Sequence, residues 1–322
     1  MTLRTRLTEK LGITHPILLA PMGSVAGGAL ARAVTEAGGL GLIGLGYGQA
    51  DWLEREFRAA GNARVGCGFI TWSLAQRPEL LDRALDHKPA VVMLSFGDPR
   101  PFAAAIKRTG ASLICQIQSV MQAVEAADAG ADIIVAQGTE AGGHGASRST
   151  LALVPAVVDA VRARHEHVIV VAAGGIADGR GLAAALMLGT DGVLIGTRFL
   201  ASSESLSSPQ AKARVVAARG DDTIRTRVFD IARGYDWPAP YTGRALRNEF
   251  SKQWHGREAE LEKAIPAGAA RYARAAEAND VDVAVVFAGE GVDLIHRIEP
   301  AGEILAAIVR DAEAALGRNW TA

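Results

Sequence analysis

One glycine-rich segment, residues 137–145, carries a histidine suited to catalysis. The segment reads Gln137-Gly138-Thr139-Glu140-Ala141-Gly142-Gly143-His144-Gly145. A histidine flanked by glycines at the open end of a fold has no core to fill, and its imidazole exchanges a proton near neutral pH. We therefore predict that His144 is a catalytic acid or base rather than an ordinary surface-loop histidine. Glu140 is expected either to orient His144 or to cap a neighbouring turn.

Two further glycine turns are suited to binding a phosphate. Gly174-Gly175 follows the apolar run 168–172, and Gly196-Thr197 follows the apolar run 193–195. Glycine lets the backbone approach a phosphate closely, and the amide N–H groups of such turns can point at its oxygens. The Thr197 hydroxyl can add another hydrogen bond. We favour a phosphate site over the alternative, in which these glycines only make tight turns.

Short apolar runs predict the elements that position these residues. The eight runs are Ile17–Ala20, Leu40–Ile43, Arg64–Gly68, Val91–Leu94, Ser112–Gln116, Ile133–Ala136, Val168–Ala172 and Val193–Ile195. They are apolar at successive positions, as in strands buried on both faces of a parallel sheet, and segments of helical periodicity lie between them. Five glycines suit the left-handed residue that ends a helix before the next strand. They are Gly38, Gly61, Gly110, Gly130 and Gly189.

A β–α unit that recurs eight times, mostly at intervals of roughly 20 to 26 residues, predicts a (β/α)8 TIM barrel. The alternative is an open doubly wound sheet. It is disfavoured because the first strand is followed by Pro21-Met22-Gly23-Ser24 and not by a G-x-G-x-x-G turn. Active sites of such barrels lie at the carboxyl ends of the strands. Few of the residues at these ends are charged, which indicates a large, flat, partly apolar ligand rather than a metal.

The composition of the chain changes after the last of these runs, which predicts three parts. We assign residues 1–204 to the barrel, 205–285 to a lid or small second domain, and 286–322 to a segment that packs back on the barrel. Within these parts, residues 259–278 predict one amphipathic helix, residues 282–288 form a short apolar run, and residues 303–316 predict a terminal helix. The arginines of the lid are interpreted as a solvated face rather than a nucleic-acid surface.

The net charge argues against strongly charged partners. The 322 residues carry a formal charge of −1, so neither nucleic acid nor an anionic membrane is an expected partner. Cys67 and Cys115 lie in apolar runs without metal-ligand spacing, which is typical of core residues in a reduced protein. No apolar stretch of signal-peptide type follows Met1–Lys10, and the uncharged run 17–31 is broken by proline and glycines. We expect a soluble, cytoplasmic protein.

Several motifs together resemble the nitronate monooxygenase family, formerly called 2-nitropropane dioxygenases. These are Ala20-Pro21-Met22, Gln137-Gly138-x-Glu140-Ala141-Gly142-Gly143-His144, Ala172-Ala173-Gly174-Gly175-Ile176, Gly196-Thr197-Arg198-Phe199, Arg244-Ala245-Leu246-Arg247-Asn248 and Phe287-Ala288-Gly289. Each motif is weak alone, but their order on the predicted strands is specific, and the resemblance spans nearly the whole chain.

The resemblance implies a non-covalently bound FMN and no metal. Ala20, Pro21, Met22 and Gln116 would face the flavin, and Gln137, Ala141 and Gly142 would edge its ring or ribityl chain. Gly174, Gly175, Gly196 and Thr197 would take the phosphate, and His144 would be the catalytic acid or base. The implied reaction is oxidation of an alkyl nitronate, with O2, to a carbonyl compound and nitrite. The implied partners are a small-molecule substrate and O2, with a homodimer as the candidate assembly.

Three departures from the family pattern fall around the substrate rather than the phosphate. Many relatives carry an asparagine after the third strand, where this chain has Gly66-Cys67-Gly68-Phe69. Ala146 replaces the usual glycine two places after the histidine, and Gly289-Glu290 replaces a frequent Gly-Gln pair. The departures therefore bear on substrate identity and leave the residues of the predicted cofactor site unchanged.

Three alternative functions are compatible with the same scaffold, and one of them is disfavoured by the residues present. The nearest is an FMN-dependent NAD(P)H oxidoreductase, either an enoyl-ACP reductase or a quinone reductase, whose flavin NADH or NADPH would bleach. A dehydrogenase of the IMP dehydrogenase class needs a nucleophilic cysteine after the sixth strand, where this chain has His144 and no cysteine. A flavin-binding protein without catalytic activity is the third.

Overall fold

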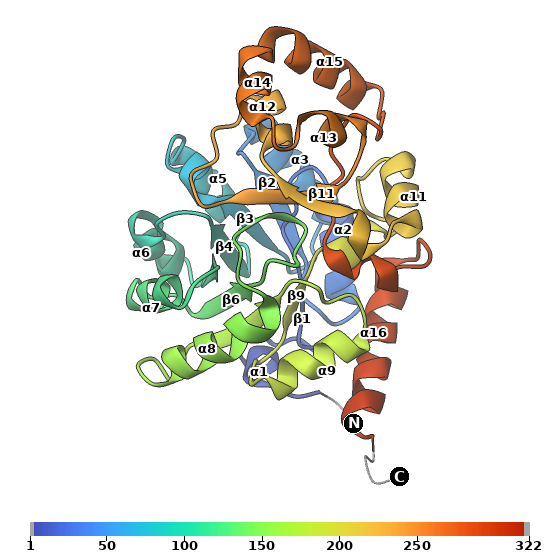
Figure 1. Ribbon diagram of the computed structural model, residues 1–322. Coiled ribbons are helices and arrows are strands. Elements are labelled where there is room, and N and C mark those ends of the chain that lie inside the picture. The colour runs from blue at the N-terminus through green and yellow to red at the C-terminus, as the bar shows by residue number, and fades with distance from the viewer. Residues whose placement is uncertain (1–2, 319–322) are drawn as a thin grey trace.

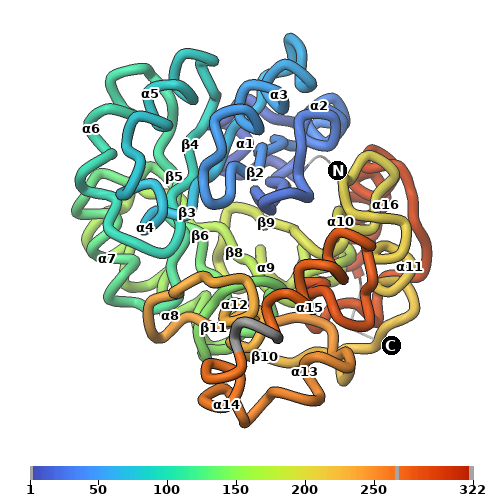
Figure 2. Tube along the Cα trace, turned by 90° about the horizontal axis from the view of Figure 1, so that it is seen from above, coloured from blue at the N-terminus to red at the C-terminus, as the bar shows by residue number. Residues whose placement is uncertain are grey.

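The eight apolar runs form eight parallel strands around a common axis. The computed structural model describes residues 3–318, apart from the side chains of residues 265–267. The strands are β1 (Ile17–Leu19), β2 (Leu42–Gly46), β3 (Gly66–Ile70), β4 (Val91–Ser95), β5 (Ser112–Ile117), β6 (Ile133–Gln137), β8 (Ile169–Ala173) and β9 (Val193–Ile195). Their order is β1-β9-β8-β6-β5-β4-β3-β2, and a parallel bridge between Leu18 and Leu40 nearly closes the ring (Figure 2). The predicted barrel is confirmed, and the alternative of an open doubly wound sheet is wrong.

The strands consist mostly of apolar residues because both faces of the sheet are buried. In β4, Val91 and Met93 belong to the cluster that fills the barrel, whereas Val92 and Leu94 belong to the cluster between the strands and the outer helices. The first helix, α1 (Arg6–Leu11), adds buried leucines to the inner cluster. This helix lies at the end of the barrel opposite the lid (Figure 1). A continuous apolar run, without alternation, is what such two-sided burial requires.

Helices surround the barrel. They are α2 (Gly28–Glu36), α3 (Ala50–Ala60), α4 (Thr71–Leu74), α5 (Glu79–Asp86), α6 (Arg100–Arg108), α7 (Val120–Asp128), α8 (Thr150–Arg162), α9 (Gly179–Met187), α10 (Thr197–Leu200) and α16 (Ala301–Leu316). The glycines predicted between helix and strand all have positive φ, for example +93° at Gly38 and +92° at Gly189. The predicted terminal helix is confirmed as α16, which packs against α9 and α2.

A small α/β unit lies over one side of the barrel mouth (Figures 1 and 2). It comprises α11 (Pro209–Ala217), η1 (Gly220–Asp222), β10 (Thr223–Thr226), α12 (Val228–Arg233), β11 (Thr242–Leu246), α13 (Glu249–Trp254), α14 (Glu258–Lys263) and α15 (Ile265–Glu277). We call residues 205–285 the lid. Phe229, Phe250, Leu261 and Tyr272 form its core. The division into domains at residues 204 and 285 stays a prediction.

Two expectations are wrong, one for the lid and one for the segment after the sixth strand. The single helix expected over residues 259–278 is two helices, α14 and α15, which meet at Ala264. The segment after the sixth strand is not only a loop. Its residues Gly143–Gly145 form β7, which pairs antiparallel with β11 in a three-stranded sheet of order β10-β11-β7. The apolar run 282–288 begins in a turn and continues as irregular chain, in which Phe287 bridges Ala245 of β11.

The two cysteines are buried and not bonded to each other, as expected of core residues. Burial raises the pKa of the Cys115 thiol to about 12 and that of Cys67 further, so both remain protonated at neutral pH. Within residues 3–318, no helix combines the length and hydrophobicity needed to cross a membrane.

Candidate active site

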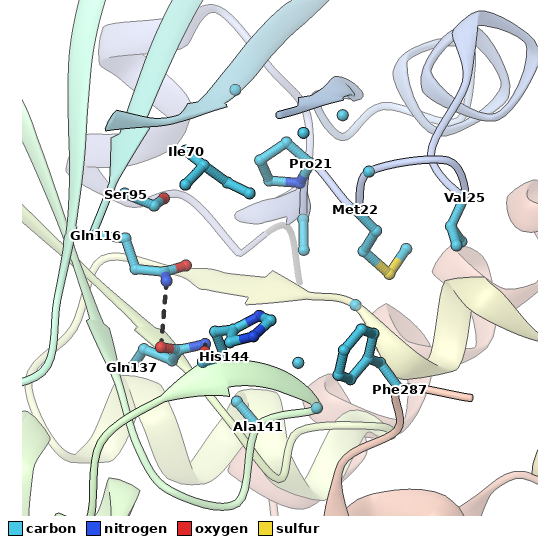
Figure 3. A pocket seen from close by; sticks show the side chains of 18 of the residues that line it. Pro21, Met22, Val25, Ile70, Ser95, Gln116, Gln137, Ala141, His144 and Phe287 are labelled. Carbon is cyan, nitrogen blue, oxygen red and sulfur yellow. Dashed lines mark hydrogen bonds between the residues drawn. The ribbon is translucent and has the colours of Figure 1, made fainter. Parts of the chain in front are cut away.

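A cavity of about 320 Å³ opens at the carboxyl ends of the strands. It is lined by every residue that the sequence analysis placed at the cofactor or in catalysis: Ala20, Pro21, Met22, Gln116, Gln137, Ala141, Gly142, His144, Gly174, Gly175, Gly196 and Thr197. Pro21 and Met22 lie across it from His144 and Phe287 (Figure 3). Segments that are far apart in the sequence therefore meet at one site, as the barrel topology requires. Its volume falls within the usual range for small-molecule sites.

The glycine turns after β8 and β9 form one end of the cavity. Gly174 and Gly175 have φ of +108° and +72°, a backbone region that favours glycine. A Cβ at Gly174 would lie 2.8 Å from Thr150 Oγ1. The Thr197 hydroxyl accepts a hydrogen bond of 3.0 Å from the Gly289 backbone N–H, which leaves its own proton available to a ligand. The next helix, α9, is capped by Asp178, which accepts from the amides of residues 180 and 181.

His144 is packed, contrary to the expectation of a loop histidine without a core. It is 9% exposed, and its ring is stacked on Trp237 with 3.5 Å between centroids and 6° between planes. Its Nε2 lies 3.0 Å from both carboxylate oxygens of Asp230, which comes from α12 and is 3% exposed. The neighbouring Gly143 and Gly145 are held in the β7–β11 pairing. The lid therefore fixes the position of the predicted catalytic residue.

The protonation of His144 follows from these contacts. A carboxylate only accepts hydrogen bonds, so Nε2 carries the proton when the ring is neutral, and Nδ1 has the lone pair. No hydrogen bond in residues 3–318 engages Nδ1. Burial lowers the pKa of His144 below its usual value, the hydrogen bond and charge of Asp230 oppose this, and the charges of Arg233 and Arg225 lower the pKa further. A neutral imidazole with a free Nδ1 is a proton acceptor.

Glu140 caps a helix rather than orienting His144. Its carboxylate accepts hydrogen bonds from the Thr150 backbone N–H, at 2.9 and 3.0 Å, and from the Thr150 hydroxyl, at 2.7 Å. Thr150 begins α8, so Glu140 satisfies an amide of the first turn. Of the two roles left open by the sequence, the structure supports the cap.

Glutamines connect three elements beneath the cavity. Gln137 Oε1 accepts from Gln116 Nε2, at 3.2 Å (Figure 3), and from Gln118 Nε2, at 2.8 Å. Gln137 Nε2 donates to the His144 carbonyl at 3.0 Å. These bonds tie β5 and β6 to β7, so Gln116 and Gln137 help to hold the backbone that carries His144.

Sequence reasoning missed most of the aromatic wall, the partner of His144 and an arginine. Tyr47, Phe96, Tyr235, Trp237, Phe287 and Arg233 also line the cavity, as do Gly289 and Gly291. The available signals were the tryptophan and proline residues of the lid and the Phe287-Ala288-Gly289 motif. Neither signal indicated which barrel residues these lid and motif residues would contact.

Known proteins share both the sequence and the fold of this chain. The family model for nitronate monooxygenase matches residues 4–65 and 70–311. The sequence is 34% identical to nitronate monooxygenase npaC of Metarhizium robertsii, over 90% of this chain and 88% of the relative. FabK from Thermotoga maritima has a TM-score of 0.83 and 33% identity, with 97% of each chain covered. Nitroalkane oxidase from Streptomyces ansochromogenes has a TM-score of 0.80 and 29% identity, over 97% of this chain and all of that one.

Proposed function

The chain belongs to the nitronate monooxygenase family, whose members depend on a flavin, and we propose that it binds FMN and oxidises alkyl nitronates with O2. The products are a carbonyl compound and nitrite. The observation that carries this proposal is the buried His144–Asp230 pair at the wall of the cavity, with its free proton-accepting Nδ1. Its partners would be the small-molecule substrate and O2.

The cavity suits a flavin because many of its lining residues are glycines and few are charged. At the end formed by Gly174 and Gly175, the absence of side chains lets a ligand approach the backbone, and we expect the N–H groups of the two turns to form a phosphate cradle there. Gly196 and Thr197 complete it. We assign the phosphate to this cradle and the ring to the region of Met22 and Gln116. Held there, FMN would supply the redox chemistry that carries electrons from the substrate to O2.

We expect the remaining residues of the predicted cofactor site to act through the backbone or through amide groups. Ala20, Pro21, Ala141 and Gly142 offer close backbone approach, and Gln137 offers an amide already fixed by its hydrogen bonds. A single phosphate cradle, without a G-x-G-x-x-G turn for a dinucleotide, favours FMN over FAD. Heat-released cofactor identified as FAD, or a protein that takes up no flavin, would contradict this assignment.

His144 would take a proton from neutral nitroalkanes. The C–H bond next to the nitro group breaks, the proton moves to Nδ1, and the electron pair moves onto the nitro group to give the nitronate. Asp230 accepts a hydrogen bond from Nε2–H and stabilises the imidazolium that results. A pre-formed nitronate is already anionic and does not need this step.

The test is anaerobic flavin reduction by His144→Ala with a neutral nitroalkane and with its pre-formed nitronate. We expect the variant to keep FMN and to lose about 10²–10⁴-fold in rate on the neutral form, with a smaller loss on the nitronate. His165→Ala is the matched control, because that histidine pairs with Asp128 and lies outside the cavity. Near-wild-type rates on both forms would remove His144 from the mechanism. Bleaching of the flavin by NADH or NADPH would favour the oxidoreductase alternative.

A further inference from the structure

One arginine of the lid lines the cavity without a hydrogen-bond acceptor. Arg233 ends α12, and its buried Nη1 has no hydrogen-bond partner in residues 3–318. The nearest carboxylate oxygen, Asp230 Oδ1, is 3.9 Å away, which is beyond hydrogen-bonding distance. Both oxygens of Asp230 lie 3.0 Å from His144. Both carboxylate oxygens of Asp230 are thus hydrogen-bonded to the histidine, and the N–H groups of Arg233 remain able to donate hydrogen bonds to a ligand.

Aromatic rings hold the guanidinium in place without using its N–H groups. Its Cζ lies 4.6 Å from the ring centroid of Tyr235, 5.6 Å from that of Tyr47 and 5.8 Å from that of Phe287. Tyr47 and Tyr235 are themselves stacked, with 3.8 Å between centroids. Rings attract a cation through their faces, but they provide no acceptor for its edge. The edge of a guanidinium binds a planar anion through two parallel hydrogen bonds.

Phe287 lies close to both Arg233 and His144. Its ring centroid is 5.3 Å from that of His144 and 5.8 Å from Arg233 Cζ. A small ligand against Phe287 can therefore reach both groups at once. We propose that Arg233 is the anion-binding group of this cavity and holds the two oxygens of the nitronate, while His144 faces its carbon. The identity of the anion rests on the proposed function, whereas the binding of a planar anion does not.

This placement makes a kinetic prediction that differs between the two substrate forms. With a pre-formed nitronate the negative charge is present on binding, so Arg233→Gln raises KM by about 10- to 100-fold. With a neutral nitroalkane the charge reaches the nitro oxygens only as His144 takes the proton. The same variant then lowers kcat and changes KM by less than about threefold.

Nitrate is the probe for binding without turnover, because it is planar, anionic and carries no hydrogen for His144 to remove. Titration of the FMN-loaded protein is followed by the flavin absorbance difference. We expect Arg233→Gln to weaken nitrate binding by about 10- to 100-fold. Arg227→Gln is the matched control, since it removes the same charge from an exposed position at the other end of α12. Its nitrate affinity should equal that of the wild type.

Failures of the two proposals are distinguishable. Equal nitrate affinity in the wild type and in Arg233→Gln overturns the anion site, even if nitronates are oxidised. Arg233-dependent nitrate binding in a protein that oxidises no nitronate supports the site and refutes the proposed function. If Arg233→Gln loses its flavin, Arg233→Lys is used to test the anion site instead. Lysine keeps the positive charge but lacks the two parallel hydrogen-bond donors of arginine. Unchanged nitrate affinity and unchanged KM in that variant overturn the proposal.

Discussion

Replacing Asp230 with asparagine tests whether its charge controls the basicity of His144. The substitution keeps the size of the side chain and an acceptor oxygen, but removes the negative charge that lies 3.0 Å from Nε2. Asp230 raises the pKa of His144, whereas burial, Arg233 and Arg225 lower it. Asp230→Asn removes the raising influence of the charge and leaves burial and the two arginines in place, so the pKa of His144 should fall further.

The magnitude follows from the distance between the two groups. Unit charges 3.0 Å apart attract by about 5 kcal/mol at an effective dielectric constant of about 20, which is a ceiling. Opposite charges at such separations shift a pKa by about 1–3 units in practice. Under the proposed function His144 is a base only when neutral, so the rate on neutral nitroalkanes should fall as the pH drops through its pKa. In Asp230→Asn this acid limb should move down by about 1–3 pH units, and the plateau should fall because a weaker base accepts the proton less readily.

The assay is the pH dependence of kcat/KM on a neutral nitroalkane and on its nitronate, with flavin content measured for each variant. We expect the nitronate reaction to change little, since it needs no proton acceptor. Asp128→Asn serves as the control, because it removes the carboxylate 2.8 Å from the outer His165. An acid limb that stays in place or moves to higher pH in Asp230→Asn would refute the assignment of His144 as the base.

Two further predictions concern the cofactor cradle and the lid core. Gly175→Ala should weaken FMN binding about tenfold or more, because its φ of +72° strains any side chain. Gly196→Ala should weaken FMN binding less, since the φ of Gly196 is −108° and an added Cβ would lie 3.4 Å from Met22 Sδ, an ordinary contact. Fluorescence titration gives both affinities, and the reverse order would contradict the cradle. Phe250→Ala, at a fully buried position, should lower the free energy of unfolding by about 3–5 kcal/mol in urea. Exposed Met187→Ala should change it by less than about 0.5 kcal/mol.

The barrel was predictable because its signals are local. Each strand is buried on both faces, so runs such as Val91–Leu94 stand out in the sequence without any knowledge of their neighbours. The glycine turns after β8 and β9 are equally local, since the close approach of the chain at Gly174 excludes a side chain. The position of these turns then follows from the barrel, where all strand ends meet at one rim.

The lid contacts were not predictable because they join distant segments. His144 and Asp230 are 86 residues apart, and neither residue type nor spacing pairs them. Strand β7 has the sequence Gly-His-Gly, which carries no strand propensity, and forms only because β11 is available to pair with it. Local helical periodicity likewise continues across Ala264, where the structure divides α14 from α15.

The pairing of β7 with β11 sets the order in which activity can appear during synthesis. Residues 143–145 leave the ribosome well before residues 242–246, with which they pair. Chains emerge at about 5–20 residues per second, and contacts of long sequence separation form late. The barrel strands can associate in this interval, but His144 has neither its strand partner nor Asp230. We therefore expect nascent chains arrested before residue 230 to lack a fixed catalytic histidine, and ribosome-bound chains extended beyond residue 316 to have one.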